Sequence, residues 1–318
     1  MAPIRTMLLI RRGTLQAGSN PDPDPANLEL VSLILSGFDP WPIPLAHNIT
    51  FSGLQGNKNR VAWGIMKSLR AILTPAELPG LRQSDLADRL CVVFDVLRAT
   101  STFITALHHG ANRIIPVSDI AEALAWREKA PQALLAGERH GVRISADLTG
   151  GIEFDLGNSP REFTPEVVCG RTIVSTTTNG TLALNACAGA AVVLAGSFLN
   201  LTATADFIRH HPAEEVILVC AGTGSSAALE DVLAAGALAH RLASPSAGFK
   251  LADSAAIAWR TFLSGEASVA EALSTTDNGR RLLGIPDLRA DVAFCGQFDC
   301  YPLVARQTAA GLQRFAPT

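Results

Sequence analysis

The sequence lacks the features that mark several common protein classes. Its 318 residues carry a net charge of −3 and only 6% aromatic side chains, so no basic surface is expected for nucleic acid or for an anionic membrane. No apolar run reaches the roughly 18 residues of a membrane-spanning helix, and the run Met7–Ile10 is too short for a signal-peptide core. We therefore expect a cytoplasmic protein without nucleic-acid or membrane partners.

Several short catalytic motifs are missing too. Leu97 stands two residues after Asp95, which excludes the D-x-D-x-T motif of aspartyl-phosphate enzymes, and no phosphate-binding P-loop or G-x-S-x-G turn occurs. The segment from Gly222 to Ala227 imitates a dinucleotide fingerprint, but no strand with a terminal acid follows it. The six cysteines form no C-x-x-C pair, which favours buried free thiols over disulfides or a zinc site.

Residues 1–65 differ from the rest of the chain. Seven of the 18 prolines fall there, and no helical or strand period persists. Such a segment is unsuited to forming a core of its own, so we expect a low-order extension at 1–65 and one catalytic domain at 66–318. Met66 as the true start of translation is our preferred explanation, and a genuine disordered extension is the alternative.

From Met66 onward, short apolar runs alternate with longer amphipathic segments. This pattern predicts an α/β fold with three layers, α/β/α, around a mainly parallel or mixed sheet. The nearly one-half content of hydrophobic residues suits that fold. Strands are expected at 90–94, 113–117, 133–136, 172–175, 191–195 and 216–220, and helices at 100–109, 119–129, 180–188, 200–209, 227–242, 250–263 and 303–312.

The most informative segment is Asp95-Val-Leu-Arg-Ala-Thr-Ser-Thr102, at a predicted strand-to-helix junction. Free N–H groups and the positive end of a helix dipole attract an anion there. Arg98 can bind its oxygens in pairs, and Asp95 can hold a divalent cation against them. A structural ion pair closing the turn is the alternative interpretation.

Six further blocks follow in order, and together they resemble the signature of the 2-phosphosulfolactate phosphatase family from about Leu73 to about Asp299. They are Ala136–Arg139, Phe154–Pro160, Thr176–Thr181, Ala195–Asn200, Cys220–Thr223 and Leu229–Asp231. The resemblance implies a magnesium-dependent phosphatase that converts (R)-2-phospho-3-sulfolactate and water to 3-sulfolactate and phosphate. The sequence leaves open whether water attacks directly, and it leaves a homo-oligomer open.

The resemblance also implies roles for individual residues. We expect catalytic roles for Asp95, Arg98, Glu138 and Arg139. Substrate contacts are expected from Asn158, Ser159, Thr178, Asn179 and Gly180, and Mg²⁺ ligands are expected among Asp95, Glu138, Asp155 and Glu230. Glu230 and Asp231 are adjacent on a helix and point about 100° apart, so one should reach the metal while the other orients a neighbour.

Departures from the family pattern at three places bear on the substrate, and one of them is Ser225–Ala228, where family members commonly carry a charged or polar group. His140 stands where glycine is usual, and the link Arg143–Ile152 looks several residues longer. Because such loops set substrate fit, a phosphatase of another small phosphorylated hydroxy-acid is one alternative. A non-catalytic anion-binding protein is the other, since binding and catalysis use overlapping residues.

Overall fold

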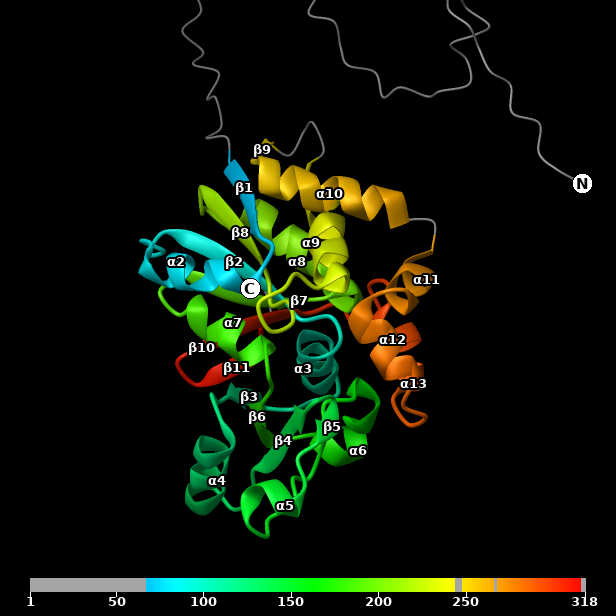
Figure 1. Cartoon of the computed structure of the whole chain (residues 1–318). Helices are drawn as coiled ribbons and strands as arrows, with labels where there is room; N and C mark the ends of the chain where they lie inside the picture. The colour runs from blue at the N-terminus through cyan, green and yellow to red at the C-terminus, as the bar shows by residue number, and fades with distance from the viewer. Residues whose placement is uncertain (1–66, 244–247, 266–267, 316–318) are drawn as a thin grey trace, which may run out of the picture. The chain divides into compact units, whose positions relative to one another are not determined.

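The computed structural model describes residues 67–243, 248–265 and 268–315. The expected extension at 1–65 and the proposed start at Met66 lie outside these residues. The described residues form an 11-stranded sheet with helices on its faces (Figure 1). Its strands are β1 (Lys67–Ile72), β2 (Arg89–Phe94), β3 (Arg113–Pro116), β4 (Leu134–Arg139), β5 (Val142–Arg143), β6 (Thr172–Thr176), β7 (Val192–Gly196), β8 (Glu215–Cys220), β9 (Phe249–Leu251), β10 (Val304–Thr308) and β11 (Gly311–Phe315).

Helices connect most of the parallel strands. They are α2 (Leu78–Gln83), α3 (Ala99–His108), α4 (Ile120–Lys129), α5 (Ala146–Thr149), α6 (Pro165–Val168), α7 (Gly180–Ala186), α8 (Leu201–His210), α9 (Leu229–Leu242), α10 (Asp253–Gly265), α11 (Val269–Ser274), α12 (Asp277–Leu283) and α13 (Arg289–Cys295), with 3-10 turns η1 (Pro75–Glu77), η2 (Pro160–Glu162) and η3 (Phe198–Asn200). No helix among the described residues combines the length and apolar character needed to cross a bilayer.

The sheet consists of two parallel blocks joined by an antiparallel hairpin. The strand order is β5-β4-β6-β3-β11-β10-β7-β2-β8-β1-β9. Strand β2 pairs in parallel with β7 and β8, and β6 pairs in parallel with β3 and β4. The hairpin β10–β11 lies between the blocks, antiparallel to β7 and β3, and is drawn in red in Figure 1. The expected α/β class with a mixed, mostly parallel sheet is confirmed.

Strand β2 explains why helices cover both faces of its block. Its side chains alternate, because successive residues of a strand point to opposite faces. Leu90, Val92 and Phe94 pack into one apolar cluster with α8, α9 and α10, whereas Cys91 and Val93 pack into another with α3 and α7. A continuous apolar run therefore marks a strand buried on both sides.

The expected helix at 303–312 is wrong. The segment instead contains β10 and the start of β11, which pair from Val304↔Phe315 to Thr308↔Gly311. Gly311 has φ +114°, a conformation that favours glycine, and a Cβ there would lie 2.5 Å from the Ile114 carbonyl oxygen. Long-range pairing with β3 and β7 decides the structure of this segment, and that information is not local.

The six cysteines are free, as expected. Four of them are buried, namely Cys91, Cys187, Cys220 and Cys295, whereas Cys169 and Cys300 are exposed. The expectation of burial is therefore correct for four of the six.

Candidate active site

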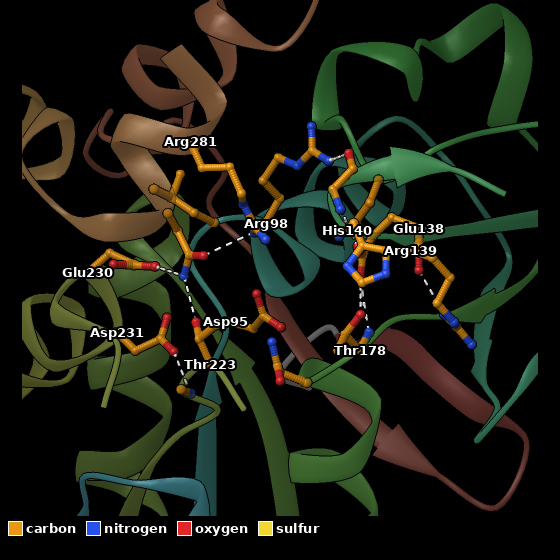
Figure 2. A pocket seen from close by; sticks show the side chains of 16 residues that line it. Asp95, Arg98, Glu138, Arg139, His140, Thr178, Thr223, Glu230, Asp231 and Arg281 are labelled. Carbon is orange, nitrogen blue, oxygen red and sulfur yellow. Dashed lines mark hydrogen bonds between the residues drawn. The ribbon is translucent and has the colours of Figure 1, made fainter. Parts of the chain in front are cut away.

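A cavity of about 240 Å³ lies at the carboxyl ends of the parallel strands. Asp95 follows β2, Glu138 lies near the end of β4, Thr178 follows β6, and Thr223 follows β8; all four line the cavity. Open α/β sheets bind ligands at this edge, because loops from neighbouring strands converge there. Figure 2 shows these side chains directed toward one space.

Asp95 is held at the junction of β2 and α3. Its Oδ1 accepts a 3.1 Å hydrogen bond from the Ala99 N–H, and its side chain is 9% exposed. Burial raises the pKa of Asp95 to about 7; the hydrogen bond from Ala99 lowers it, and the charges of Glu138 and Glu230 raise it further. The carboxylate is therefore costly to ionise without a cation nearby.

Glu138 is fixed by a two-residue turn between β4 and β5. His140 and Gly141 form this turn with φ of +56° and +85°. Positive φ at both positions is what a type I′ hairpin turn needs, which explains why glycine suits position 140. The Gly141 N–H donates to Glu138 Oε2 at 2.7 Å, and the Thr178 N–H and hydroxyl donate to Oε1 at 3.0 and 2.8 Å. Burial opposes ionisation, but these bonds outweigh it and lower the pKa of Glu138.

Glu230 and Asp231 lie in the first turn of α9 and are nearly fully buried. Asp231 accepts hydrogen bonds from Val96 N at 2.8 Å and Gly222 N at 3.0 Å, so it ties together the loops that follow β2 and β8. Burial, followed by the charges of Glu230 and Asp95, raises the pKa of Asp231. Glu230 instead accepts from the Asn278 amide at 2.5 Å through Oε1.

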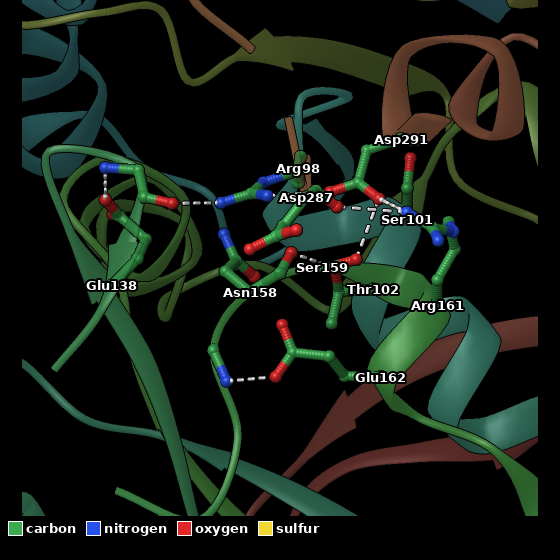
Figure 3. A network of polar contacts seen from close by, with 12 residues as sticks. Arg98, Ser101, Thr102, Glu138, Asn158, Ser159, Arg161, Glu162, Asp287 and Asp291 are labelled. Atoms are coloured by element: carbon green, nitrogen blue, oxygen red, sulfur yellow. Dashed lines mark hydrogen bonds and ion pairs between the residues drawn. The ribbon is translucent and has the colours of Figure 1, made fainter. Parts of the chain in front are cut away.

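Arg98 lines the cavity, but its guanidinium forms hydrogen bonds with other protein groups. Its guanidinium is 3% exposed and donates to Asp291 Oδ2 at 2.7 Å and to the Gly141 carbonyl at 2.5 Å. Ser159 donates to the other oxygen of Asp291 at 2.7 Å (Figure 3). The buried ion pair braces the turn beneath Glu138 and uses part of the Arg98 guanidinium, whose expected contact with phosphate stays a prediction.

Arg139 also has protein partners. Its Nη1 donates to the Glu138 carbonyl at 2.7 Å, and its Nη2 donates to Thr176 Oγ1 at 3.2 Å. Figure 2 shows its guanidinium on the side of the Glu138 carbonyl that faces away from Asp95. The position follows from strand alternation, since adjacent residues of β4 point to opposite faces.

The expected substrate contacts divide into two groups. Asn158, Thr178 and Asn179 line the cavity, whereas Ser159 and Gly180 lie behind it. A Cβ on Gly180 would lie 2.7 Å from Asp95 Oδ2, so glycine is needed there to let α7 approach that carboxylate.

The structure does not bring Asp155 to the cavity. Its Oδ2 pairs with Arg127 of α4 and accepts from the Leu135 N–H at 2.7 Å. That carboxylate holds α4 and β4 together, so we remove it from the set of expected metal ligands.

Two cavity residues were missed by sequence reasoning. Asn278 and Arg281 come from α12, where nothing in the local sequence distinguishes them from surface polar residues. Asn278 is 8% exposed, donates to Thr223 Oγ1 at 2.8 Å and to Glu230, and accepts from Arg281 Nη2 at 3.0 Å. Only the packing of α12 across the cavity reveals them.

The carboxylates of the cavity decide whether Mg²⁺ can bind there. No three His, Cys, Asp or Glu side chains form a ready metal cluster within residues 67–243, 248–265 and 268–315. Mg²⁺ usually needs only one or two carboxylates and completes its shell with water and phosphate oxygens. Asp95 Oδ2 and Glu230 Oε2 accept no hydrogen bond from the described residues, so these two carboxylates fit that mode.

The fold and the cavity define an α/β enzyme whose site combines buried carboxylates with polar anion-binding groups. A family model described as 2-phosphosulpholactate phosphatase matches residues 73–310. The chain belongs to the 2-phosphosulpholactate phosphatase family, and it is thus a phosphoric monoester hydrolase.

Curated relatives agree with this assignment, and each of the following is named "Probable 2-phosphosulfolactate phosphatase". One from Thermotoga petrophila is 40% identical over 216 residues, covering 68% of this chain and 88% of the relative. One from Deinococcus radiodurans is 39% identical, covering 71% and 89%. One from Synechococcus sp. strain RCC307 is 35% identical, covering 76% and 97%.

Proposed function

We propose that this chain hydrolyses (R)-2-phospho-3-sulfolactate to 3-sulfolactate and phosphate with Mg²⁺ bound in the cavity. Family membership and the names of the relatives support the substrate. The observation that carries the metal is electrostatic. Asp95, Glu230 and Asp231 are buried around one small space, and the pKa values of Asp95 and Asp231 are raised by burial and by the neighbouring carboxylates.

A phosphate ester is itself an anion, so these carboxylates would repel it. A divalent cation attracts both the carboxylates and the phosphate oxygens. It therefore offsets the repulsion among the buried carboxylates and the repulsion between them and the phosphate. Asp95 and Glu230 would hold the ion through their free oxygens, with Asp231 fixing the loops on either side. When bound, Mg²⁺ neutralises charge on the phosphoryl oxygens and lowers the pKa of a bound water.

Protein groups would position the substrate. Asn158, Thr178 and Asn179 present an amide, a hydroxyl and a second amide to the cavity. The Thr178 hydroxyl and N–H are already oriented by Glu138, whose lowered pKa keeps it an acceptor at neutral pH. In the net reaction the ester P–O bond breaks, water supplies the new phosphate oxygen, and the departing alkoxide takes a proton.

His140 favours the second candidate, a phosphatase of another small phosphorylated hydroxy-acid. This imidazole lines the cavity from a turn with positive φ. A side chain at that position narrows the space available to substrate in comparison with glycine. The cytoplasmic location and the homo-oligomer stay predictions.

The test is phosphate release by the full chain from racemic phosphosulfolactate, with Mg²⁺ and with a chelator. We expect turnover only with Mg²⁺, and a loss of at least roughly 10³-fold in kcat/KM for Asp95→Asn, equivalent to about 4 kcal/mol. Asp155→Asn makes the same chemical change outside the cavity and serves as the matched control. It should keep activity near that of wild type.

The comparison with chelator tests the metal, and the comparison of substrates tests which ester is hydrolysed. Metal-independent turnover would reject Mg²⁺ while leaving the substrate. No release from phosphosulfolactate, together with release from phospholactate or phosphoglycolate, would select the second candidate.

A further inference from the structure

Three arginines line the cavity, and their surroundings differ. Arg98 is neutralised by Asp291, and Arg139 donates to the Glu138 carbonyl and to Thr176. Arg281 forms no salt bridge with any carboxylate of the described residues, and its Nη2 donates to Oδ1, the side-chain amide oxygen of Asn278. Only one of its five N–H donors is used in this way, so the others are available to a ligand.

Asn278 fixes the orientation of Arg281. The Asn278 amide nitrogen donates to Glu230 Oε1 at 2.5 Å and to Thr223 Oγ1 at 2.8 Å. A carboxylate can only accept, so the amide nitrogen must face Glu230 and the amide oxygen must face Arg281. One buried side chain therefore contacts both Glu230, a buried carboxylate, and the guanidinium of Arg281, an exposed residue.

The Arg281 side chain also lies close to the turn between β4 and β5. A side-chain carbon placed on Gly141 would lie 4.0 Å from the guanidinium carbon and Nε of Arg281. Arg281 thus extends from α12 toward the turn that carries His140. A ligand in the cavity would have this guanidinium along its open side.

Depth in the cavity distinguishes the two ends of a substrate. Asp95, Glu230 and Asp231 are 9%, 1% and 2% exposed, whereas Arg281 is exposed. A phosphate held near the deep carboxylates through a cation leaves the rest of the molecule toward the mouth. A guanidinium there can form paired hydrogen bonds with a carboxylate or a sulfonate.

We propose that Arg281, oriented by Asn278, binds one of the acid groups that stay on the product, the carboxylate or the sulfonate, and so selects phosphate esters that carry such a group in addition to the phosphate. This inference rests on the proposed function, because it takes phosphate to be the group bound near the buried carboxylates. Arg281 acts here in substrate binding and specificity, while Asn278 is a positioning residue.

The test compares Arg281→Met with Arg280→Met in the full chain. Methionine keeps much of the apolar stem and removes the charge. Arg280 is the neighbouring residue of α12, pairs with Asp277 and does not line the cavity, so its variant controls for the loss of one positive charge. We measure calorimetric binding of 3-sulfolactate and of inorganic phosphate, both with Mg²⁺, and steady-state hydrolysis of phosphosulfolactate and phospholactate.

We expect Arg281→Met to weaken 3-sulfolactate binding and to raise the KM for phosphosulfolactate roughly tenfold to hundredfold, as for loss of a hydrogen bond to a charged group. Phosphate binding and kcat should change less than about threefold, and Arg281→Lys should recover part of the loss. A raised KM for phospholactate as well would assign the contact to the carboxylate. A raised KM for phosphosulfolactate alone would assign it to the sulfonate.

Equal weakening of phosphate and 3-sulfolactate would overturn the inference, as would equal effects of Arg280→Met and Arg281→Met. Failure of the proposed function has a different signature. In that case the wild-type chain would release no phosphate from phosphosulfolactate, whereas the calorimetric comparison needs no turnover.

Discussion

Two groups of buried charges lie next to each other in this protein, and they differ in how the charge is compensated. Arg98 and Asp291 form a buried pair at 2.7 Å, with side chains 3% and 0% exposed. Asp95, Glu230 and Asp231 are three buried carboxylates around one cavity; burial and the charge of Glu230 raise the pKa values of Asp95 and Asp231. In the first group the buried charges are paired with opposite charges, since Asp291 also pairs with Arg161 at 3.5 Å, whereas the three carboxylates form no salt bridge with the described residues.

The difference separates structural charge from functional charge. A buried charge with its partner in place holds elements together, and here it joins the start of α3 to α13. Buried like charges lower stability, so their presence indicates a ligand that compensates them. Arg98 and Asp95 come from the same short motif, yet Arg98 belongs to the paired charges and Asp95 to the three cavity carboxylates.

The largest effect is expected from breaking the pair of Arg98 and Asp291. Asp291→Asn would leave the Arg98 guanidinium buried without its counter-charge and should lower the free energy of unfolding by about 4 kcal/mol. Urea denaturation measures the change, and Asp287→Asn, an exposed acid nearby, is the matched control. A loss below about 1 kcal/mol would mean that Arg98 does not depend on this pair.

The second largest effect is expected on the pH dependence of stability in chelator-treated protein, where the cavity carboxylates have no metal ion beside them. Asp95 has a folded-state pKa of about 7 against an ordinary value of 3.8, so its stabilising contribution is complete below pH 3.8 and is lost as the pH rises through 7. Asp231 shifts in the same direction. The metal-free protein should therefore become less stable between pH 5 and about 7.5.

Mg²⁺ should reverse that loss. At a concentration of about 100 times its Kd, it should add about 2.7 kcal/mol at pH 7.5, and less at pH 5, where protons compete for the carboxylates. Thermal unfolding with and without Mg²⁺ measures this. Asp95→Asn should be at least as stable as wild type without metal and should lose most of the response; an unchanged response would exclude Asp95 as a ligand.

The strands and the segments that meet at the cavity could be predicted from the sequence. The six expected strands are present, because a strand buried on both faces leaves a continuous apolar run. The acids of the β2, β4 and α9 blocks reach one cavity, because parallel strands end at the same edge of the sheet. The sequence therefore predicted which segments meet.

It did not predict which charge pairs with which. Asp291, the partner of Arg98, is 193 residues away along the chain, and Arg281 enters the site only through the packing of α12. Asp155 lies in a family block, as the expected metal ligands Asp95 and Glu230 do, yet its carboxylate is paired with Arg127 of α4. Such choices depend on tertiary distances that no local pattern contains, as does the β10–β11 hairpin.

The smallest effect tests Glu138, which belongs to neither group. It is a cavity carboxylate compensated by hydrogen bonds, and its pKa is lowered although burial opposes this. Thr178→Val removes the hydroxyl that donates to Oε1 at 2.8 Å and should cost about 1 kcal/mol of unfolding free energy at pH 7. Thr178→Ser keeps the hydroxyl and should be close to wild type.

The pH dependence of that cost has the opposite sign to that of Asp95. A carboxylate with a lowered pKa contributes stability above its ordinary value of 4.5 and loses it as the pH falls through its folded-state pKa. The difference between wild type and Thr178→Val should therefore be full at pH 7 and shrink below pH 4.5. A difference that stays constant on acidification would mean that the hydroxyl contributes through packing, because protonation of Glu138 would then not alter its contribution.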